Sequence, residues 1–250
     1  MLCAHARREW LTLATATLLL TAAAAIMTWW ITAALILLIG LAGVLSFRDP
    51  DRQPPSQRGV VVAPADGRIA SIHEAPDLDT FDTPTLCIRT FLSLFNVHVV
   101  RMPCYGRIAA IHHRDGKHLS ALNPASAEEN QAITLILNHP TRDEPVAAVR
   151  LIAGQFARTI RLFVTEGQTL QRGQRLGIIL LGSTAECYLP NPDQVRPLLE
   201  TGAKVRAAES IIAEPIRSPH PATTSTPTEP ASKPAEPTAP PPEPQPIEAS

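Results

Sequence analysis

The sequence predicts a mainly β (α+β) protein, in which a compact domain of β-hairpins follows an N-terminal helical hairpin in the membrane. Residues 11–45 carry no charged side chain, whereas residues 58–213 alternate short apolar runs with turn residues. Of the 25 prolines, 12 lie in the last 37 residues. We therefore expect a membrane anchor over residues 1–47, a folded domain over 48–213 and a disordered Pro-rich tail over 214–250.

The uncharged segment Leu11–Leu45 is too long for one membrane span. As a single helix its 35 residues would extend about 52 Å, against a hydrocarbon core of about 30 Å. Two spans with a turn near Met27–Trp30 fit better, although one span stays an alternative. Arginines flank both ends, which predicts a hairpin in the cell membrane with the folded domain on the cytoplasmic side: Arg7, Arg8, Arg48, Arg52 and Arg58.

A cleaved signal peptide is the competing interpretation of this segment. Arg7 and Arg8 precede the apolar run Leu11–Leu20, and Ala22–Ala25 resembles a cleavage region. The apolar sequence continues for another 20 residues beyond that region, which favours a retained anchor.

The following domain contains ten candidate strands and little helix. Helical patterns occur only at Ser126–Gln131 and Gly154–Thr159, and Pro64–Gly67 and Thr165–Gln168 are typical of tight turns. The expected strands are Gly59–Val62, Arg68–Ile72, Leu86–Thr90, Val97–Met102, Arg107–His112, Ala132–Asn138, Val146–Ile152, Thr159–Val164, Arg175–Leu181 and Glu186–Leu189.

Composition and spacing exclude several functional classes. The net charge of −1 argues against a nucleic-acid partner. Nucleotide-binding, zinc-protease and α/β-hydrolase motifs do not occur in the sequence. The histidines at 112, 113 and 118 have no thiol or carboxylate placed to complete a site, so no metal is expected. The four cysteines form no CxxC pair and indicate a reducing compartment: Cys3, Cys87, Cys104 and Cys187.

Two tight turns between short apolar runs are similar to the hairpins of barrel-sandwich domains, which include lipoyl and biotinyl carriers and membrane-fusion adaptors. They lie within Val62–Ile69 and Val164–Leu176. A carrier needs a lysine at a hairpin tip, which neither Asp66–Gly67 nor Glu166–Gly167 supplies, and an adaptor needs coiled-coil heptads, which are absent. A non-catalytic, membrane-anchored adaptor of this kind remains the alternative function.

Four blocks of residues occur in a specific order: Phe47–Pro50, Ala63–Gly67, Phe91–Pro103 and Arg175–Thr184. Three weaker blocks accompany them: Gly116–Lys117, Ala127–Asn130 and Ile152–Gly154. With all of these in order, the chain resembles the short, membrane-associated phosphatidylserine decarboxylases. The resemblance covers about residues 47–190 and does not include the Pro-rich tail.

The resemblance implies that the chain is made as a precursor that cleaves itself between Gly182 and Ser183. Ser183 Oγ would attack the Gly182 carbonyl, and β-elimination would release a large chain, 1–182, from a small chain, 183–250. Hydrolysis would then convert position 183 into a pyruvoyl group with loss of ammonia. From Gly182-Ser183-Thr184 alone, a plain β-turn would be the better interpretation.

The implied reaction converts phosphatidylserine in the bilayer to phosphatidylethanolamine. The pyruvoyl ketone forms a Schiff base with the serine amine and accepts the electrons released with carbon dioxide, as pyridoxal phosphate would. The sequence leaves open which lipid backbone is preferred and whether the enzyme is a homo-oligomer.

Two further catalytic residues are implied by the same resemblance. Asp66 matches the aspartate assigned to self-cleavage, although an Asx-turn would also explain an Asp-Gly pair. His98 matches the histidine that delivers a proton beside the pyruvoyl group. The long-form enzymes have a second histidine directly before Met-Pro, where this chain has Arg101. The base for self-cleavage is therefore either His98 or an unidentified group that works with Asp66.

Overall fold

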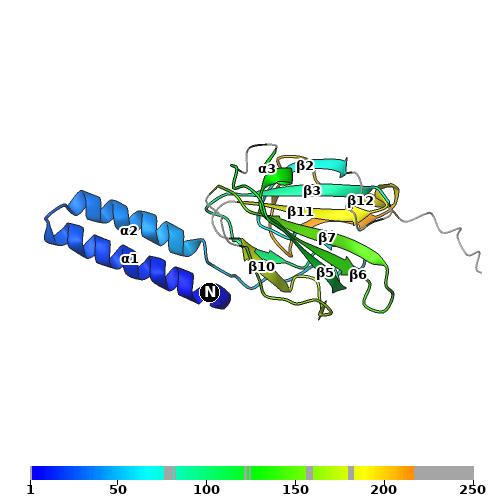
Figure 1. Ribbon diagram of the computed structural model, residues 1–250, viewed down its shortest axis with the longest axis horizontal. Coiled ribbons are helices and arrows are strands. Elements are labelled where there is room, and N and C mark those ends of the chain that lie inside the picture. Colours follow the sequence, from blue (N-terminus) through cyan, green and yellow to red (C-terminus); the bar gives the residue numbers. More distant parts are fainter. Residues whose placement is uncertain are drawn as a thin grey trace, which may run out of the picture. The chain divides into compact units, whose positions relative to one another are not determined.

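A computed structural model describes residues 2–75, 81, 83–120, 123, 125–155, 160–179 and 183–216 (Figure 1). After a short 3-10 helix, η1 (Ala4–Ala6), two antiparallel helices form the expected hairpin: α1 (Arg7–Ile26) and α2 (Trp30–Leu45). Their 20 and 16 residues correspond to about 30 and 24 Å. By length and composition α1 can cross a membrane, and α2 is a shorter apolar helix.

The helices approach closely where Gly40 of α2 meets Thr17 of α1. A Cβ atom at position 40 would lie 2.1 Å from Thr17 Cγ2, so a larger residue would push the helices apart. Small residues at such crossings are typical of helix pairs in membranes. The turn between the helices contains Thr28, whose φ of 63° lies in the left-handed region. The two-helix hairpin and the position of its turn are thus confirmed.

The rest of the described chain is mainly β, as predicted, and all strand pairs are antiparallel (Figure 1). The large sheet has the order β13 (Lys204–Val205), β2 (Gly67–Ala75), β3 (Thr85–Leu92), β11 (Ser183–Pro190), β7 (Pro145–Ile152), β6 (Ala132–Asn138), β5 (Gly106–Arg114) and β9 (Thr169–Leu170). Two small sheets have the orders β1 (Val61–Val62), β14 (Ile211–Pro215), β12 (Val195–Pro197) and β4 (Val99–Arg101), β10 (Arg175–Ile179), β8 (Ile160–Leu162). Short helices α3 (Ser126–Glu129) and η2 (Pro192–Gln194) complete the described elements.

The expected barrel-sandwich-like domain of hairpins consists of three open sheets, and the described part of the chain forms no closed barrel. Each of the ten expected strands overlaps an observed one, whereas β9, β12, β13 and β14 were not predicted. Those four are two to five residues long, too short for an alternating pattern to stand out. Of the two expected helices, α3 is present, and residues 156–159 of the other lie outside the described residues.

The core lies on one face of the large sheet. Alternate residues of its central strands point to this face and pack with residues of the small sheets; among those fully buried are Ile69, Ile88, Leu151, Leu176 and Cys187. On the opposite face, the buried Glu186 forms an ion pair with the half-buried Arg89, whose Nη2 lies 2.7 Å from Glu186 Oε1. A second apolar cluster on this face surrounds Phe81 and Tyr188.

The helical hairpin is joined to the sheets through its two ends. The Cys3 amide donates to the Phe47 carbonyl over 2.8 Å, and the Ser46 hydroxyl donates to the Leu94 carbonyl over 2.8 Å. A buried apolar cluster covers the junction: Cys3, Ala6, Phe47, Val97, Val99 and Ile178. The base of the helical hairpin therefore packs directly against the strands next to the site described below.

Candidate active site

Strand pairing brings the predicted site residues to one end of the sheets. Ser183, the first residue of β11, pairs with Leu92 of β3, and β3 pairs in turn with β2, which Asp66 precedes. A Cβ atom at Gly67 would lie 2.0 Å from the Phe91 carbonyl oxygen, so this close approach requires glycine. His98 joins the same end because its carbonyl accepts the Ile179 amide over 3.2 Å. Ile179 ends β10, and residues 180–182 connect it to Ser183.

The Ser183 side chain is completely buried, and its Oγ has no hydrogen-bond partner among the described residues. A buried hydroxyl without a partner costs about 1–3 kcal/mol, and other described hydroxyls, such as those of Ser71 and Thr90, share this state, so the place of Ser183 at the start of β11 is what distinguishes it. Its position fits the expected precursor of a pyruvoyl group. Gly182, the other half of the expected cleavage site, lies outside the described residues.

Asp66 is buried and bound by two groups. Arg52 Nη2 donates to both carboxylate oxygens over 2.9 and 3.1 Å, and the Ala207 amide donates to Oδ1 over 2.8 Å. Burial raises the pKa of Asp66, and the Ala207 amide and the Arg52 guanidinium counteract this rise. Arg52 also binds Glu209 over 3.0 Å. The described partners of Asp66 thus fix its carboxylate in place and include no histidine.

His98 is buried, with Nδ1 3.3 Å from the Ser46 carbonyl oxygen. Since a carbonyl can only accept, this contact places the proton on Nδ1. Burial lowers the pKa of His98, so the imidazole is neutral at neutral pH. Ser46 follows α2 directly, and the base of the helical hairpin therefore orients the proposed proton donor.

Arg101, which stands where long-form enzymes have a second histidine, is a buried structural clamp. Its guanidinium contacts Asp49 Oδ1 over 2.6 Å, the Pro50 carbonyl over 2.8 Å and the Gly173 carbonyl over 3.0 Å. Asp49 also binds Arg175 Nε over 2.5 Å. A guanidinium does not act as a base at physiological pH. Breaking such a buried pair typically costs about 3–5 kcal/mol.

Four functional neighbours were not identified from the sequence: Ser46, Asp49, Arg52 and Ala207. The first three lie within or beside the Phe47–Pro50 block, which the resemblance marked as relevant without giving it a role. Ser46 and Asp49 each lie 52 residues before their partners, His98 and Arg101. Arg52 lies 14 residues before its partner in the site, Asp66. Only tertiary contacts could reveal these links.

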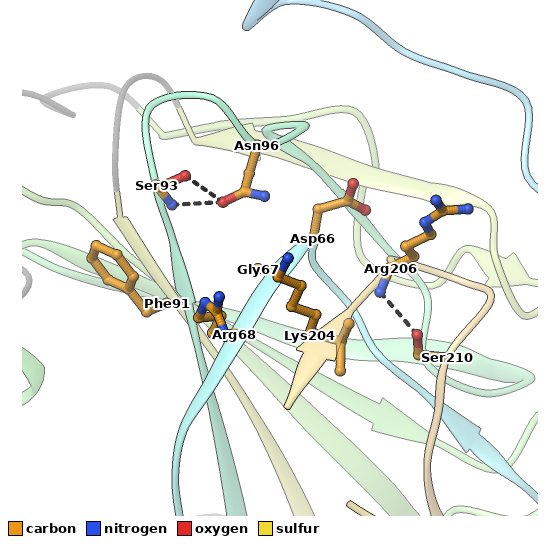
Figure 2. A pocket seen from close by; sticks show the side chains of 10 residues that line it. Asp66, Gly67, Arg68, Phe91, Ser93, Asn96, Lys204, Arg206 and Ser210 are labelled. Carbon is orange, nitrogen blue, oxygen red and sulfur yellow. Dashed lines mark hydrogen bonds between the residues drawn. The ribbon is translucent and has the colours of Figure 1, made fainter. Parts of the chain in front are cut away.

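A pocket of about 650 Å³ opens beside Asp66 (Figure 2). In the turn that forms one wall, Asn96 Oδ1 accepts hydrogen bonds from the Ser93 amide and hydroxyl over 2.9 and 2.6 Å. Its other lining residues come from β2, β3 and the segment 204–210, and include Arg68, Phe91, Lys204, Arg206 and Ser210. The pocket therefore has a mixed polar and apolar lining with three cationic side chains, those of Arg68, Lys204 and Arg206, and lies at the end of the sheet where β11 begins.

The adjacent histidines of β5 do not belong to this site and form no metal site with other described residues. His112 and His113 are successive exposed residues of β5, so their side chains point to opposite faces of the sheet. Within the described residues, no group of three His, Cys, Asp or Glu side chains is arranged to hold a metal ion.

Known proteins support the assignment made from these residues. The sequence model of the family described as phosphatidylserine decarboxylase matches residues 42–213. The chain is 40% identical to the phosphatidylserine decarboxylase proenzyme of Granulibacter bethesdensis over 171 residues, which are 67% of this chain and 68% of that one. It is 41% identical to the proenzyme of the same name from Azorhizobium caulinodans over 184 residues, 72% and 77% of the two chains. For the one from Pelobacter propionicus the values are 37% over 184 residues, 72% and 80%. These similarities rule in favour of the enzyme over the non-catalytic adaptor, and the chain belongs to the phosphatidylserine decarboxylase family.

Proposed function

We propose that this chain cleaves itself between Gly182 and Ser183 and then decarboxylates phosphatidylserine to phosphatidylethanolamine. The observation that carries the proposal is the buried, unpartnered hydroxyl of Ser183 at the start of β11, which is separated only by β3 from β2, the strand that Asp66 precedes. The direct test is to incubate the purified protein with vesicles of phosphatidylserine labelled in the serine carboxyl group. Labelled carbon dioxide and unlabelled phosphatidylethanolamine should appear in equal amounts.

The proposed cleavage needs only atoms of the chain and one water molecule. Ser183 Oγ bonds to the Gly182 carbonyl carbon as the Gly182–Ser183 amide bond breaks, which leaves an ester and a free amine on residue 183. Loss of the Cα proton then expels the Gly182 carboxylate, and water replaces the nitrogen of residue 183 as ammonia. The pyruvoyl group formed in this way supplies an electron sink for decarboxylation. Two products of defined length, 1–182 and 183–250, follow from this chemistry.

In the proposed site His98 delivers the proton that replaces the lost carboxyl group. Its Nδ1 contact with the Ser46 carbonyl fixes the orientation of the ring and directs Nε2 away from Ser46. The surrounding burial excludes bulk water, which would otherwise compete in proton transfer. Asp66, held by Arg52 and Ala207, is proposed to polarise the groups around the scissile bond rather than to accept the serine proton through a histidine.

Replacing the Asp66 carboxylate should impair self-cleavage. We expect Asp66→Asn to slow the appearance of the small chain by at least about 10²-fold, because the charge that polarises the cleavage site is lost. Time-resolved gel analysis of freshly expressed protein measures the rate. Asp66→Glu, which retains the charge, should cleave faster than Asp66→Asn, and Asp143→Asn, with a side chain 82% exposed, should cleave as the wild type does. Normal cleavage by Asp66→Asn would remove Asp66 from the proposed mechanism.

We also propose that the protein acts at the cytoplasmic face of the cell membrane. The apolar helices α1 and α2 and the flanking arginines support this location. Beside the base of α2, the turn that borders the pocket exposes Leu94 and Phe95, which are 42% and 71% exposed. Arg48 Nη2 donates to the Phe95 carbonyl over 2.8 Å and fixes this turn to the anchor. An exposed aromatic residue beside a membrane anchor is typical of contact with the lipid interface.

The double variant Leu94→Ser/Phe95→Ser should turn over phosphatidylserine in vesicles at least about fivefold more slowly, because loss of two apolar side chains from the interface weakens access to bilayer substrate. Turnover of a soluble, short-chain phosphatidylserine should be unchanged, since the site itself is intact. Leu198→Ser, at another leucine that is 40% exposed, is the matched control and should be neutral with both substrates. Equal losses with both substrates would show that the turn supports the site and not membrane access.

A further inference from the structure

Two cationic side chains oppose one another across the pocket wall. Lys204 of β13 pairs in register with Arg68 of β2, so both side chains leave the same face of the sheet (Figure 2). Like charges placed directly opposite on neighbouring strands destabilise a sheet. Neither side chain forms an ion pair with a carboxylate of the described residues; Arg68 Nη1 donates only to the Gly202 carbonyl, over 3.0 Å.

The other charges of the pocket are already balanced. Asp66 is bound by Arg52, and Arg206 lies 3.7 Å from Glu209. Arg68 and Lys204 are therefore the two charged residues of the described pocket lining that have no oppositely charged partner. A pocket with two unbalanced cations and hydrogen-bonding side chains favours an anionic ligand.

The neighbouring strands β13, β2, β3 and β11 connect these cations to the proposed cleavage site. Arg68 is the register partner of Phe91, and Phe91 is the partner of Thr184, so these side chains share one face of the sheet, whereas the side chain of Ser183, at the start of β11, leaves the other face. With neighbouring strands about 4.8 Å apart, the backbones of Arg68 and Thr184 are about 10 Å apart. The amine and the phosphate of a phosphoserine headgroup are separated by only a few covalent bonds. Because Ser183 is the first residue of β11, a headgroup whose amine lies at this strand end can extend around it and place its phosphate against the long guanidinium side chain of Arg68.

We propose that Arg68 and Lys204 form a subsite for the phosphodiester of the substrate headgroup. This inference rests on the proposed function and adds the residues that recognise the phosphate. Arg68 offers a planar pair of N–H donors suited to two phosphate oxygens, and Lys204 adds a second positive charge on the same face. The glycerol side of the headgroup then lies toward Phe91 and the turn with Leu94 and Phe95, whose exposed side chains face the proposed lipid interface.

The test measures binding separately from turnover. Full-length, uncleaved Ser183→Ala protein is titrated with short-chain phosphatidylserine, short-chain phosphatidylglycerol and inorganic phosphate, in the wild-type background and with Arg68→Gln or Lys204→Gln. We expect each substitution to weaken binding of both lipids by about tenfold or more, because one charged hydrogen-bond partner is lost. Arg142→Gln, at an arginine in another part of the domain, is the matched control and should leave binding unchanged.

In the cleaved enzyme the same substitutions should raise KM for short-chain phosphatidylserine by a similar factor and change kcat less than twofold. Cleavage itself should proceed normally. Unchanged lipid affinity in both variants would overturn the subsite. If inorganic phosphate alone loses affinity, the pair binds free phosphate and not the headgroup, which also overturns the inference. A wild-type protein that binds lipid through Arg68 and Lys204 but releases no carbon dioxide would refute the proposed function and leave the subsite intact.

Discussion

Ser183→Ala is expected to remain a single, inactive chain of 27.0 kDa, whereas the wild-type protein separates into two chains. Alanine has no oxygen to attack the Gly182 carbonyl, and no other side chain can generate the ketone at this position. Intact-mass spectrometry should find fragments 1–182 and 183–250 in the wild type. The small fragment should lack a free N-terminal amine and resist Edman degradation.

A second serine controls for a general loss of fold. Ser71 of β2 also has a buried Oγ without a partner among the described residues, but it lies within the strand and away from its first residues. Ser71→Ala should cleave and turn over as the wild type does. An active wild-type preparation that stays at 27.0 kDa would rule out self-cleavage as the origin of the activity.

His98→Ala is expected to separate the two reactions. Cleavage takes place once in the life of the chain and tolerates a slow rate, so the small chain should still appear within hours. Decarboxylation needs a proton in every cycle, and loss of a positioned acid typically costs about 10²–10⁴-fold. We therefore expect turnover to fall at least about a hundredfold in the cleaved variant. His139→Ala, between β6 and β7, should leave both reactions unchanged.

The pH dependence should carry the signature of His98. The protonated form of His98, which can donate a proton, becomes more populated as the pH falls. Burial lowers the pKa of His98 below its ordinary value of 6.5, so this protonation takes place at a lower pH than in a free imidazole. In the wild type kcat should decrease as the pH rises through this pKa, with a midpoint below 6.5. His98→Ala should lack that transition. Accumulation of only uncleaved precursor in His98→Ala would instead identify His98 as the base for cleavage.

The elements of this protein with a strong local pattern could be predicted from its sequence. The apolar segment of residues 11–45 predicted two helices because its length exceeds one span, and they are α1 and α2. Short apolar runs bounded by turn residues predicted the long strands, such as β3 and β6, which are buried along nearly their whole length. The strands β9, β12, β13 and β14 were not predicted because runs of two to five residues are too short to show a period. One of them, β13, places Lys204 opposite Arg68.

The sequence by itself also determined the candidate residues, since ordered blocks of residues identify a family whatever the fold around them. What those residues touch was decided only by the tertiary structure. Asp66 is bound by Arg52, Arg101 clamps Asp49, and the Ser46 carbonyl orients His98. Each of these contacts joins segments distant in the chain. The physical reason is that a buried charge or imidazole is stabilised by whichever partner folding brings within about 3 Å, and sequence spacing does not specify that partner.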